Sequence, residues 1–259
     1  MPEGRGLGDP AARRALDELH AKGLNFEPER RAISRAQGWR IDDYCRTLPS
    51  EPPGPPVPGA SWEIARGLMR DYEFADPAIV RAIYYPDRPL EQRDMLLEGR
   101  FFGLRFYFGC RIGGLIDETR TVEARDVRVW GWNYRTLQGH LEMGQMDYEV
   151  WKWIDSGEVE FRIHAFSKPA RIPNPLVRLG FWLFGRTMQV RFAERACDRM
   201  ARLTAERLDG RAGASTRAMP PEQPDLTVRP ARDRPRAQKR ITRHLNPGES
   251  SGAGNKRVS

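Results

Sequence analysis

Four side chains suited to acid–base chemistry lie close together in the sequence, namely His140, Glu142, Glu149 and His164. An imidazole titrates near neutral pH and a carboxylate can accept a proton, so this group could transfer protons or hold a metal ion. A metal ion needs a third firm ligand at suitable spacing, and the other two histidines lie in segments that we expect to be loosely ordered. We therefore predict no metal site, and the candidate catalytic residues are His140, His164 and Glu149.

A structural role for the same residues is the favoured alternative. Glu149 and His164 would form an ordinary cross-strand ion pair if they lie opposite each other, and His140 would fix the turn at Gly139. Ser167 lies three positions from His164, so the two side chains would point to opposite faces of a strand and would not act as nucleophile and base. The sequence has no Walker A loop, no GxGxxG motif in a βαβ setting and no HExxH motif. Nucleotide-dependent chemistry is therefore disfavoured, no cofactor is predicted, and whether the protein is an enzyme stays open, with a non-catalytic role favoured.

Three consecutive antiparallel strands are predicted to position these residues, within residues 127–171. Side chains there alternate in polarity with a period of two, and the stretch is rich in Val, Trp, Tyr and Ile, which favour strands. A two-residue turn at Ser156 and Gly157 would place Glu149 opposite His164. The first of the three strands would present Trp132 and Tyr134 on one face.

Elements predicted on either side of these strands complete an α+β fold. A strand over residues 39–46, an amphipathic helix over 61–72 and strands over 78–85 and 95–116 precede them. Past Pro175, apolar residues recur at helical spacing and predict a long helix that ends at Gly210. A curved antiparallel sheet that grips a long C-terminal helix resembles the helix-grip (START-like) architecture.

The ends of the chain differ in composition from its middle. We predict a loosely ordered N-terminal extension with a proline-rich linker over residues 1–59, a helix-grip-like domain over 60–208 and a disordered tail over 209–259. The formal net charge is +8, and the tail holds 11 Lys and Arg against 5 Asp and Glu. A solvated tail is the favoured interpretation, and polyanion contact through residues 211–243 is the alternative.

The cysteines and the hydropathy pattern give an expectation for the compartment. Cys45, Cys110 and Cys197 lie far apart without CxxC spacing, which predicts reduced thiols. The N-terminus lacks the pattern of a signal peptide, and no apolar run is long enough to form a transmembrane segment. We therefore expect a cytoplasmic protein.

Three motifs carry a family resemblance. They are Tyr-Arg-Thr-Leu-Gln-Gly-His at Tyr134–His140, Glu-Met-Gly-Gln-Met-Asp-Tyr at Glu142–Tyr148 and Phe-Arg-Ile-His-Ala-Phe-Ser-Lys-Pro-Ala at Phe161–Ala170. The chain resembles the domain of unknown function nineteen-ninety family, whose pattern runs Tyr-Gly-Thr-Leu-Pro-Gly-His, Glu-Ser-Gly-Glu-Glu and Phe-Ser-Arg-Pro. An Arg and a Gln on the closing helix follow in that pattern, and Arg186 and Gln189 match them. The sequence departs from the pattern at Arg135, Gln138, Met143, Gln145 and Met146.

The resemblance covers residues 60–207 and implies a domain of unestablished activity that is related to the helix-grip superfamily. A sheet that grips a helix commonly leaves an apolar cavity, and such cavities are default ligand sites. We therefore predict non-catalytic binding of a small apolar or amphipathic molecule between sheet and helix. The candidate ligand-binding residues are Trp132, Tyr134, Tyr148, Phe184, Arg186 and Gln189. The alternatives are a cyclase- or hydrolase-type enzyme that uses His140 and His164, and polyanion binding through the tail.

Overall fold

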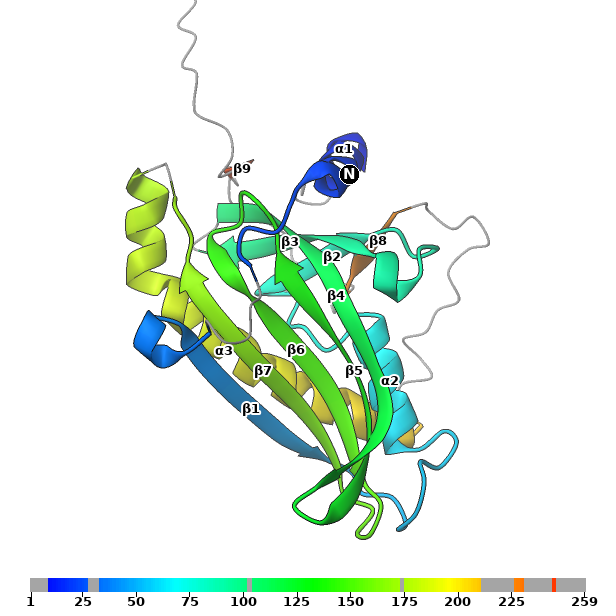
Figure 1. Cartoon of the computed structure of the whole chain (residues 1–259). Helices are drawn as coiled ribbons and strands as arrows, with labels where there is room; N and C mark the ends of the chain where they lie inside the picture. Colours follow the sequence, from blue (N-terminus) through cyan, green and yellow to red (C-terminus); the bar gives the residue numbers. More distant parts are fainter. Residues whose placement is uncertain are drawn as a thin grey trace, which may run out of the picture.

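One large antiparallel sheet and one long helix make up most of the chain in a computed structural model (Figure 1). The structure describes residues 9–27, 33–101, 104–172, 175–210, 226–230 and 244–245. In spatial order the sheet contains β1 (Arg40–Leu48), β7 (Val159–Pro169), β6 (Glu142–Trp153), β5 (Arg125–Thr136), β4 (Leu104–Val122), β3 (Asp94–Phe101), β2 (Val80–Tyr84) and β8 (Thr227–Arg229). The two-residue β9 (His244–Leu245) pairs with β4 outside this order. The helices are α1 (Asp9–Asp17), α2 (Ser61–Arg70) and α3 (Pro175–Leu208), with short 3₁₀ turns η1 (Glu18–Ala21), η3 (Arg35–Gln37) and η4 (Leu90–Gln92).

The long helix α3 lies across one face of the sheet, against β1 and β7, and also contacts α2 (Figure 1). We call this face of the sheet the inner face and the opposite one the outer face. The predicted fold, a curved antiparallel sheet gripping a long C-terminal helix, is confirmed. Within the described residues, no helix combines the length and the apolar character that crossing a membrane would require.

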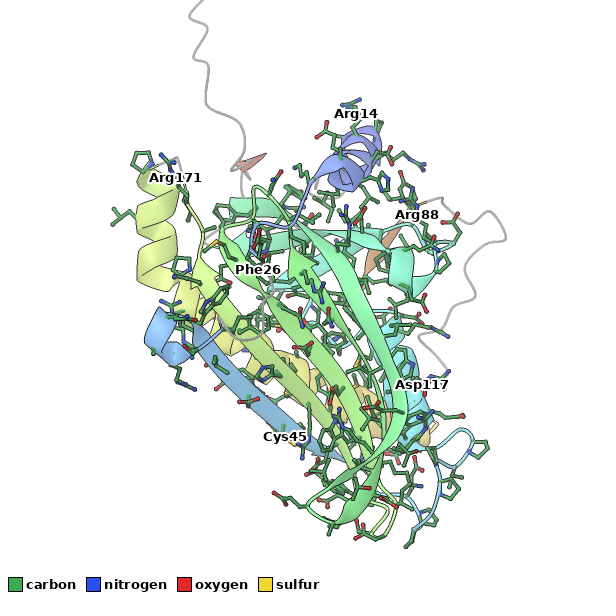
Figure 2. The ribbon with its side chains drawn as sticks, viewed as in Figure 1. Arg14, Phe26, Cys45, Arg88, Asp117 and Arg171 are labelled. Carbon is green, nitrogen blue, oxygen red and sulfur yellow. The ribbon has the colours of Figure 1, made fainter. Side chains whose placement is uncertain are left out.

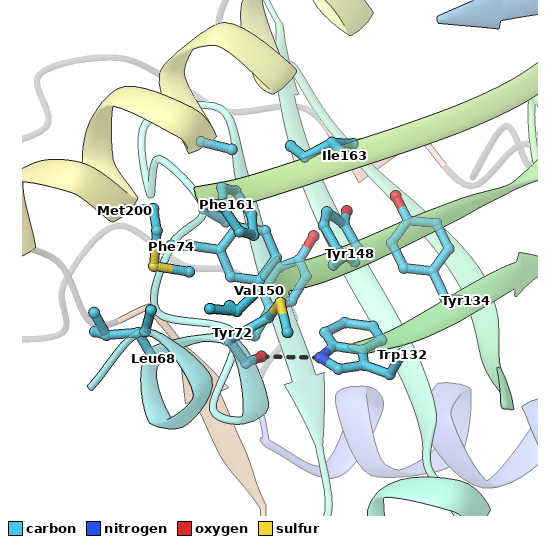
Figure 3. Packing of buried hydrophobic residues seen from close by; sticks show 14 of the residues in the cluster. Leu68, Tyr72, Phe74, Trp132, Tyr134, Tyr148, Val150, Phe161, Ile163 and Met200 are labelled. Carbon is cyan, nitrogen blue, oxygen red and sulfur yellow. Dashed lines mark hydrogen bonds between the residues drawn. The ribbon is translucent and has the colours of Figure 1, made fainter. Parts of the chain in front are cut away.

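Aromatic side chains fill the space between the inner face and the helices (Figure 3). Trp132, Tyr148 and Phe161 project from β5, β6 and β7, and all three are fully buried. The ring of Phe74, which follows α2, lies 4.7 Å from the ring of Tyr148. The strands alternate, so every second residue reaches this core, and each large apolar side chain that is fully buried stabilises the fold by roughly 1.5–3 kcal/mol.

The turn between β6 and β7 is longer than the two-residue turn predicted at Ser156 and Gly157. The N–H of Gly157 donates to the carbonyl of Trp153 at 2.8 Å, and the N–H of Trp153 donates to the carbonyl of Glu158 at 2.9 Å. Four residues therefore form the loop. The N–H of Ile154 is held by the carbonyl of Asp126 at 2.9 Å, which keeps this residue out of the β6–β7 pairing.

The longer loop shifts the register of β6 on β7 by two residues, so the predicted pairing of Glu149 with His164 is wrong. Glu149 lies opposite Arg162, and His164 lies opposite Asp147. A shift of two residues leaves each side chain on the face that its alternation predicts. The faces of the strands could therefore be predicted although their register could not.

The N-terminal segment differs from the loosely ordered extension that the sequence suggested. Ala12 and Leu16 of α1 and Leu19 of η1 are buried, each with 2% or less of its surface exposed. They pack with Leu96 and Leu137 in a second apolar cluster. The apolar stripe of this segment is narrow, and the sheet supplies the complementary surface that buries it. The strand β1 also precedes the predicted domain boundary at residue 60, and it pairs with β7 along its whole length.

The proline-rich segment folds around a buried ion pair. The ammonium of Lys152 on β6 lies 2.7 Å from a carboxylate oxygen of Glu51 and 2.8 Å from the carbonyl of Pro55. The same carboxylate accepts the N–H groups of Val57 at 3.0 Å and Trp62 at 2.7 Å. Both charged side chains are almost completely buried. The predicted linker is therefore fixed to the sheet and leads directly into α2.

Part of the predicted disordered tail belongs to the sheet. Leu226 is buried in the second apolar cluster, and Thr227–Arg229 pairs with β2 as β8. The guanidinium of Arg229 lies 2.8 Å from the carboxylate of Glu73. Residues 211–225, 231–243 and 246–259, which include most of the predicted polyanion-binding segment, lie outside the described residues.

Candidate functional site

A cluster of polar side chains joins α3 to the inner face at one end of the sheet. Arg186 of α3 donates two hydrogen bonds to the carboxylate of Asp42 on β1, at 2.5 and 2.7 Å. This bidentate ion pair holds the pKa of Asp42 below its usual range. Asp42 was missed in the sequence, where the only signal is a pair of adjacent acidic residues in the strand predicted over residues 39–46. The alternation of the strand sends Asp42 to the inner face and Asp43 to the outer face.

Gln189, one helical turn after Arg186, contacts two further strands. Its side-chain amide donates to the hydroxyl of Ser167 on β7 at 3.1 Å and to the carboxylate of Glu142 on β6. The carboxamide oxygen of Gln189 is buried and has no hydrogen-bond partner among the described residues. We call Glu142, Ser167 and Gln189 the polar cluster. Its members come from the second and third sequence motifs and from the helix, so the fold brings together positions that the family resemblance had singled out.

Burial changes the ionisation of Glu142 and of its neighbour His140. Loss of hydration raises the pKa of Glu142 to about 7, although the amide of Gln189 and nearby arginines favour the charged form. Burial also lowers the pKa of His140 to about 4, so its imidazole is neutral at pH 7. The Nδ1 atom of His140 accepts the backbone N–H of Glu142 at 3.0 Å, which fixes the turn between β5 and β6. This is the turn-fixing role that the favoured alternative assigned to His140.

Three of the predicted ligand-binding residues, Trp132, Tyr134 and Tyr148, lie on the inner face. Trp132 and Tyr148 are fully buried in the aromatic core, and Trp132 donates its ring N–H to the carbonyl of Met69 at 3.3 Å. Tyr134 is nearly buried, and the hydroxyls of Tyr134 and Tyr148 point to the same side of the core (Figure 3). Both hydroxyls contact the sulfur of Met146, at 3.7 and 2.9 Å. Phe184 belongs to α3, but its side chain lies outside the described residues.

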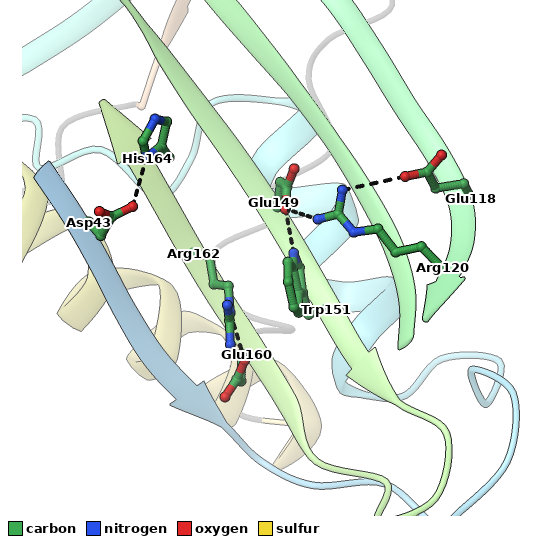
Figure 4. Close-up of polar contacts among 8 residues, drawn as sticks. All are labelled: Asp43, Glu118, Arg120, Glu149, Trp151, Glu160, Arg162 and His164. Atoms are coloured by element: carbon green, nitrogen blue, oxygen red, sulfur yellow. Dashed lines mark hydrogen bonds and ion pairs between the residues drawn. The ribbon is translucent and has the colours of Figure 1, made fainter. Parts of the chain in front are cut away.

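The other predicted catalytic residues lie on the outer face, away from the polar cluster (Figure 4). The Nδ1 atom of His164 lies 2.7 Å from a carboxylate oxygen of Asp43, and both side chains are largely exposed. Glu149 accepts hydrogen bonds from Arg120, at 2.7 Å, and from the indole of Trp151. The ring of His140, by contrast, packs 5.0 Å from Phe108, which adjoins the inner core. The structure therefore does not bring His140 and His164 to one site. Ser167 and His164 also point to opposite faces, as predicted.

The described residues contain no group of three or more His, Cys, Asp and Glu side chains that could hold a metal ion. The three cysteines are free thiols, with Cys110 and Cys197 buried and Cys45 exposed on β1. Burial raises the pKa of Cys197 to about 12, so this thiol stays protonated and unreactive.

A groove that the sequence did not predict lies on the outer face. Its volume is about 660 Å³, within the usual range for small-molecule sites. Figure 2 shows this face, with Cys45 on β1 near one edge and Asp117 on β4 near the other. The groove is lined by charged residues of β1, β4, β6 and β7 and by apolar residues that include Ile41, Ile116 and Phe166.

Comparison with protein families identifies the chain. The family described as Domain of unknown function (DUF1990) matches residues 26–199, more than half of the sequence. The chain belongs to this family. The match begins before β1, in agreement with the structure, in which the sheet begins ahead of residue 60.

Comparison with curated proteins gives no match. Among solved structures, human STARD10 aligns with a TM-score of 0.37 and 9% identity, covering 82% of this chain and 85% of its own. A START superfamily protein from Mycobacterium smegmatis aligns with a TM-score of 0.32 and 12% identity, and the alignment covers 68% of this chain and 99% of that protein. The protein Ara h 8.0201 aligns with a TM-score of 0.34 and 12% identity, and the alignment covers 63% of this chain and 98% of that protein.

Proposed function

We propose that this member of the DUF1990 family binds a small amphipathic molecule, without chemical conversion, between the inner face of the sheet and α3. The polar end of the molecule would be held by the polar cluster of Glu142, Ser167 and Gln189. Its apolar part would lie against the aromatic side chains of β5 and β6 and beneath the first turns of α3, whose sequence from Leu176 to Phe184 is mostly apolar.

The observation that carries this proposal is the buried, unpaired carboxamide oxygen of Gln189. A buried acceptor that lacks a donor costs roughly 1–3 kcal/mol, and such a group in a folded protein calls for an explanation. A hydroxyl, amide or amine hydrogen of a ligand would supply the missing bond. The carboxyl of Glu142 beside it, with its pKa raised to about 7, can donate or accept near neutral pH. The polar cluster is thus suited to an uncharged polar group more than to an anion.

The surrounding contacts hold the side chains of the polar cluster in fixed positions. The ion pair of Arg186 with Asp42 fixes α3 on β1, one helical turn before Gln189. The hydrogen bond from Gln189 to Ser167 orients the side-chain amide, so its oxygen is presented in one direction. A preformed acceptor of this kind binds with a smaller entropic cost than one that must be ordered by the ligand.

Native mass spectrometry of the protein purified from its own host tests the proposal. We expect a bound small molecule that organic solvent releases from the wild-type protein. Gln189→Leu removes the acceptor and should abolish or strongly reduce the bound mass. Gln92→Leu, the same substitution at an exposed position of η4, should leave it unchanged. A wild-type protein without a bound molecule, or equal loading of the Gln189→Leu variant, would contradict the proposed site.

A further inference from the structure

The groove on the outer face is a second candidate site, separated from the polar cluster by the thickness of the sheet. Gly131 lies between Glu149 and Ile116, two residues that line the groove, in the register of β6, β5 and β4. A Cβ atom on Gly131 would lie 2.6 Å from the carbonyl oxygen of Tyr148, so a side chain cannot be accommodated there without a shift of the backbone. The central strand therefore carries no side chain between Glu149 and Ile116.

Most charged side chains in the groove are already paired. Asp43 lies 2.7 Å from His164, and Glu149 lies 2.7 Å from Arg120 (Figure 4). The guanidinium groups of Arg120 and Arg162 cover the ring of Trp151, at 4.7 and 3.8 Å from its centre. These arginines and this ring are engaged with the protein, so an incoming molecule gains little from them.

Asp147 differs from the other carboxylates in the groove. Among the described residues no Lys, Arg or His side chain forms a salt bridge with it, and the side-chain amide of Gln145 donates a hydrogen bond to one of its carboxylate oxygens at 2.7 Å. The carbonyl of Gln145 in turn accepts a hydrogen bond from Arg135 at 2.9 Å, which orients the amide toward Asp147. One carboxylate oxygen is thus held in place and the other is left for a partner. Burial raises the pKa of Asp147, although the amide of Gln145 and the charges of His164 and Arg135 favour its ionised form.

We propose that the outer groove binds a small organic cation, with its protonated amine on the free carboxylate oxygen of Asp147 and its apolar part against Ile41, Ile116 and Phe166. Among the carboxylates that line the groove, Asp43 and Glu149 each have a basic side chain at 2.7 Å, whereas Asp147 forms no salt bridge within the described residues. The groove volume of about 660 Å³ accommodates a molecule of this kind. This site is independent of the sheet–helix site and of its ligand.

Titration of the full-length, ¹⁵N-labelled protein with three matched probes tests this assignment. The probes are 2-phenylethylamine, which is a cation, 2-phenylethanol, which is neutral, and phenylacetate, which is an anion. The amine should shift the amide signals of Asp147 and Ile116 in a saturable way. The alcohol should bind at least about tenfold more weakly, because it lacks the charge-assisted hydrogen bond. Phenylacetate should bind more weakly still.

Variants separate the role of Asp147 from general effects. Asp147→Asn should raise the Kd of the amine at least about tenfold, to the value of the alcohol. Asp155→Asn, in the β6–β7 loop beside Arg125, should leave it unchanged, and Gln189→Leu should as well. If Asp147→Asn does not fold, the Kd values of the amine and the alcohol for the wild-type protein still show whether the groove prefers a cation. Equal affinity for amine and alcohol, a preference for phenylacetate, or shifts confined to other surfaces would overturn the proposal.

Discussion

Replacing Glu142 by glutamine should change how the stability of the protein depends on pH. The pKa of Glu142 is raised from an ordinary value of 4.5 to about 7, mainly because burial removes water from the carboxylate. At a free-energy difference of about 1.4 kcal/mol for each pKa unit, this corresponds to about 3 kcal/mol. The value is an upper limit, since the side chain retains some contact with solvent.

The sign follows from the direction of the shift. Below pH 4.5 the carboxyl is protonated in both the folded and the unfolded chain, so its contribution to stability is complete. Between pH 4.5 and 7 the unfolded chain loses this proton while the folded chain keeps it, and the free energy of unfolding decreases. Above pH 7 the full contribution of about 3 kcal/mol is lost. Glutamine resembles the protonated acid and has no such dependence.

Urea denaturation, followed by tryptophan fluorescence between pH 4 and 8, measures this effect. Subtracting the curve of Glu142→Gln from that of the wild type cancels the other titrating groups, which both proteins share. The difference should fall as the pH rises through this range. Glu118→Gln, at an exposed position of β4, should give a flat difference and serves as the control. A flat difference for Glu142→Gln, or one that rises with pH, would refute the assignment of a buried, desolvated carboxyl.

Two further predictions concern the buried ion pair of Lys152 with Glu51 and the C-terminal tail. Lys152→Met should lower the free energy of unfolding by about 3–5 kcal/mol, because it leaves the carboxylate of Glu51 buried without its cation. The control Lys168→Met, near the surface, should lower the free energy of unfolding by less than about 1 kcal/mol. Equal effects of the two substitutions in urea denaturation would contradict the buried ion pair. Replacing the arginines and the lysine of residues 231–243 by glutamine should lower the salt concentration that elutes the protein from heparin. The variant leaves β8 intact, because the substitutions begin after it. Unchanged elution would exclude polyanion binding by this segment.

Local patterns in the sequence were sufficient to predict the main elements of the fold. Alternation placed Trp132 and Tyr134 on the inner face, and helical spacing after Pro175 predicted α3. These features depend on neighbouring residues of the chain, and the side-chain period of a strand does not change with its partner. The motif positions Arg186 and Gln189 were likewise correctly placed on the helix.

Features that depend on distant segments could not be predicted in this way. The register of β6 on β7 is fixed by a four-residue loop that is held by Asp126, so the partner of His164 is Asp147 and not Glu149. The burial of Lys152 depends on Glu51, which lies far from it in the sequence. The outer groove likewise depends on the register of several strands. No pattern within a single strand contains this information.

The location of the bound molecule tests the central claim most directly. Isotope-filtered NOE spectra of the ¹³C,¹⁵N-labelled protein, loaded with the unlabelled molecule recovered from its host, record which protein hydrogens lie near the ligand. We predict cross-peaks to the side-chain amide of Gln189 and to the methyl group of Met146. Cross-peaks to Ile116 and Phe166 in place of these, or none on the inner face, would contradict ligand binding between the sheet and α3.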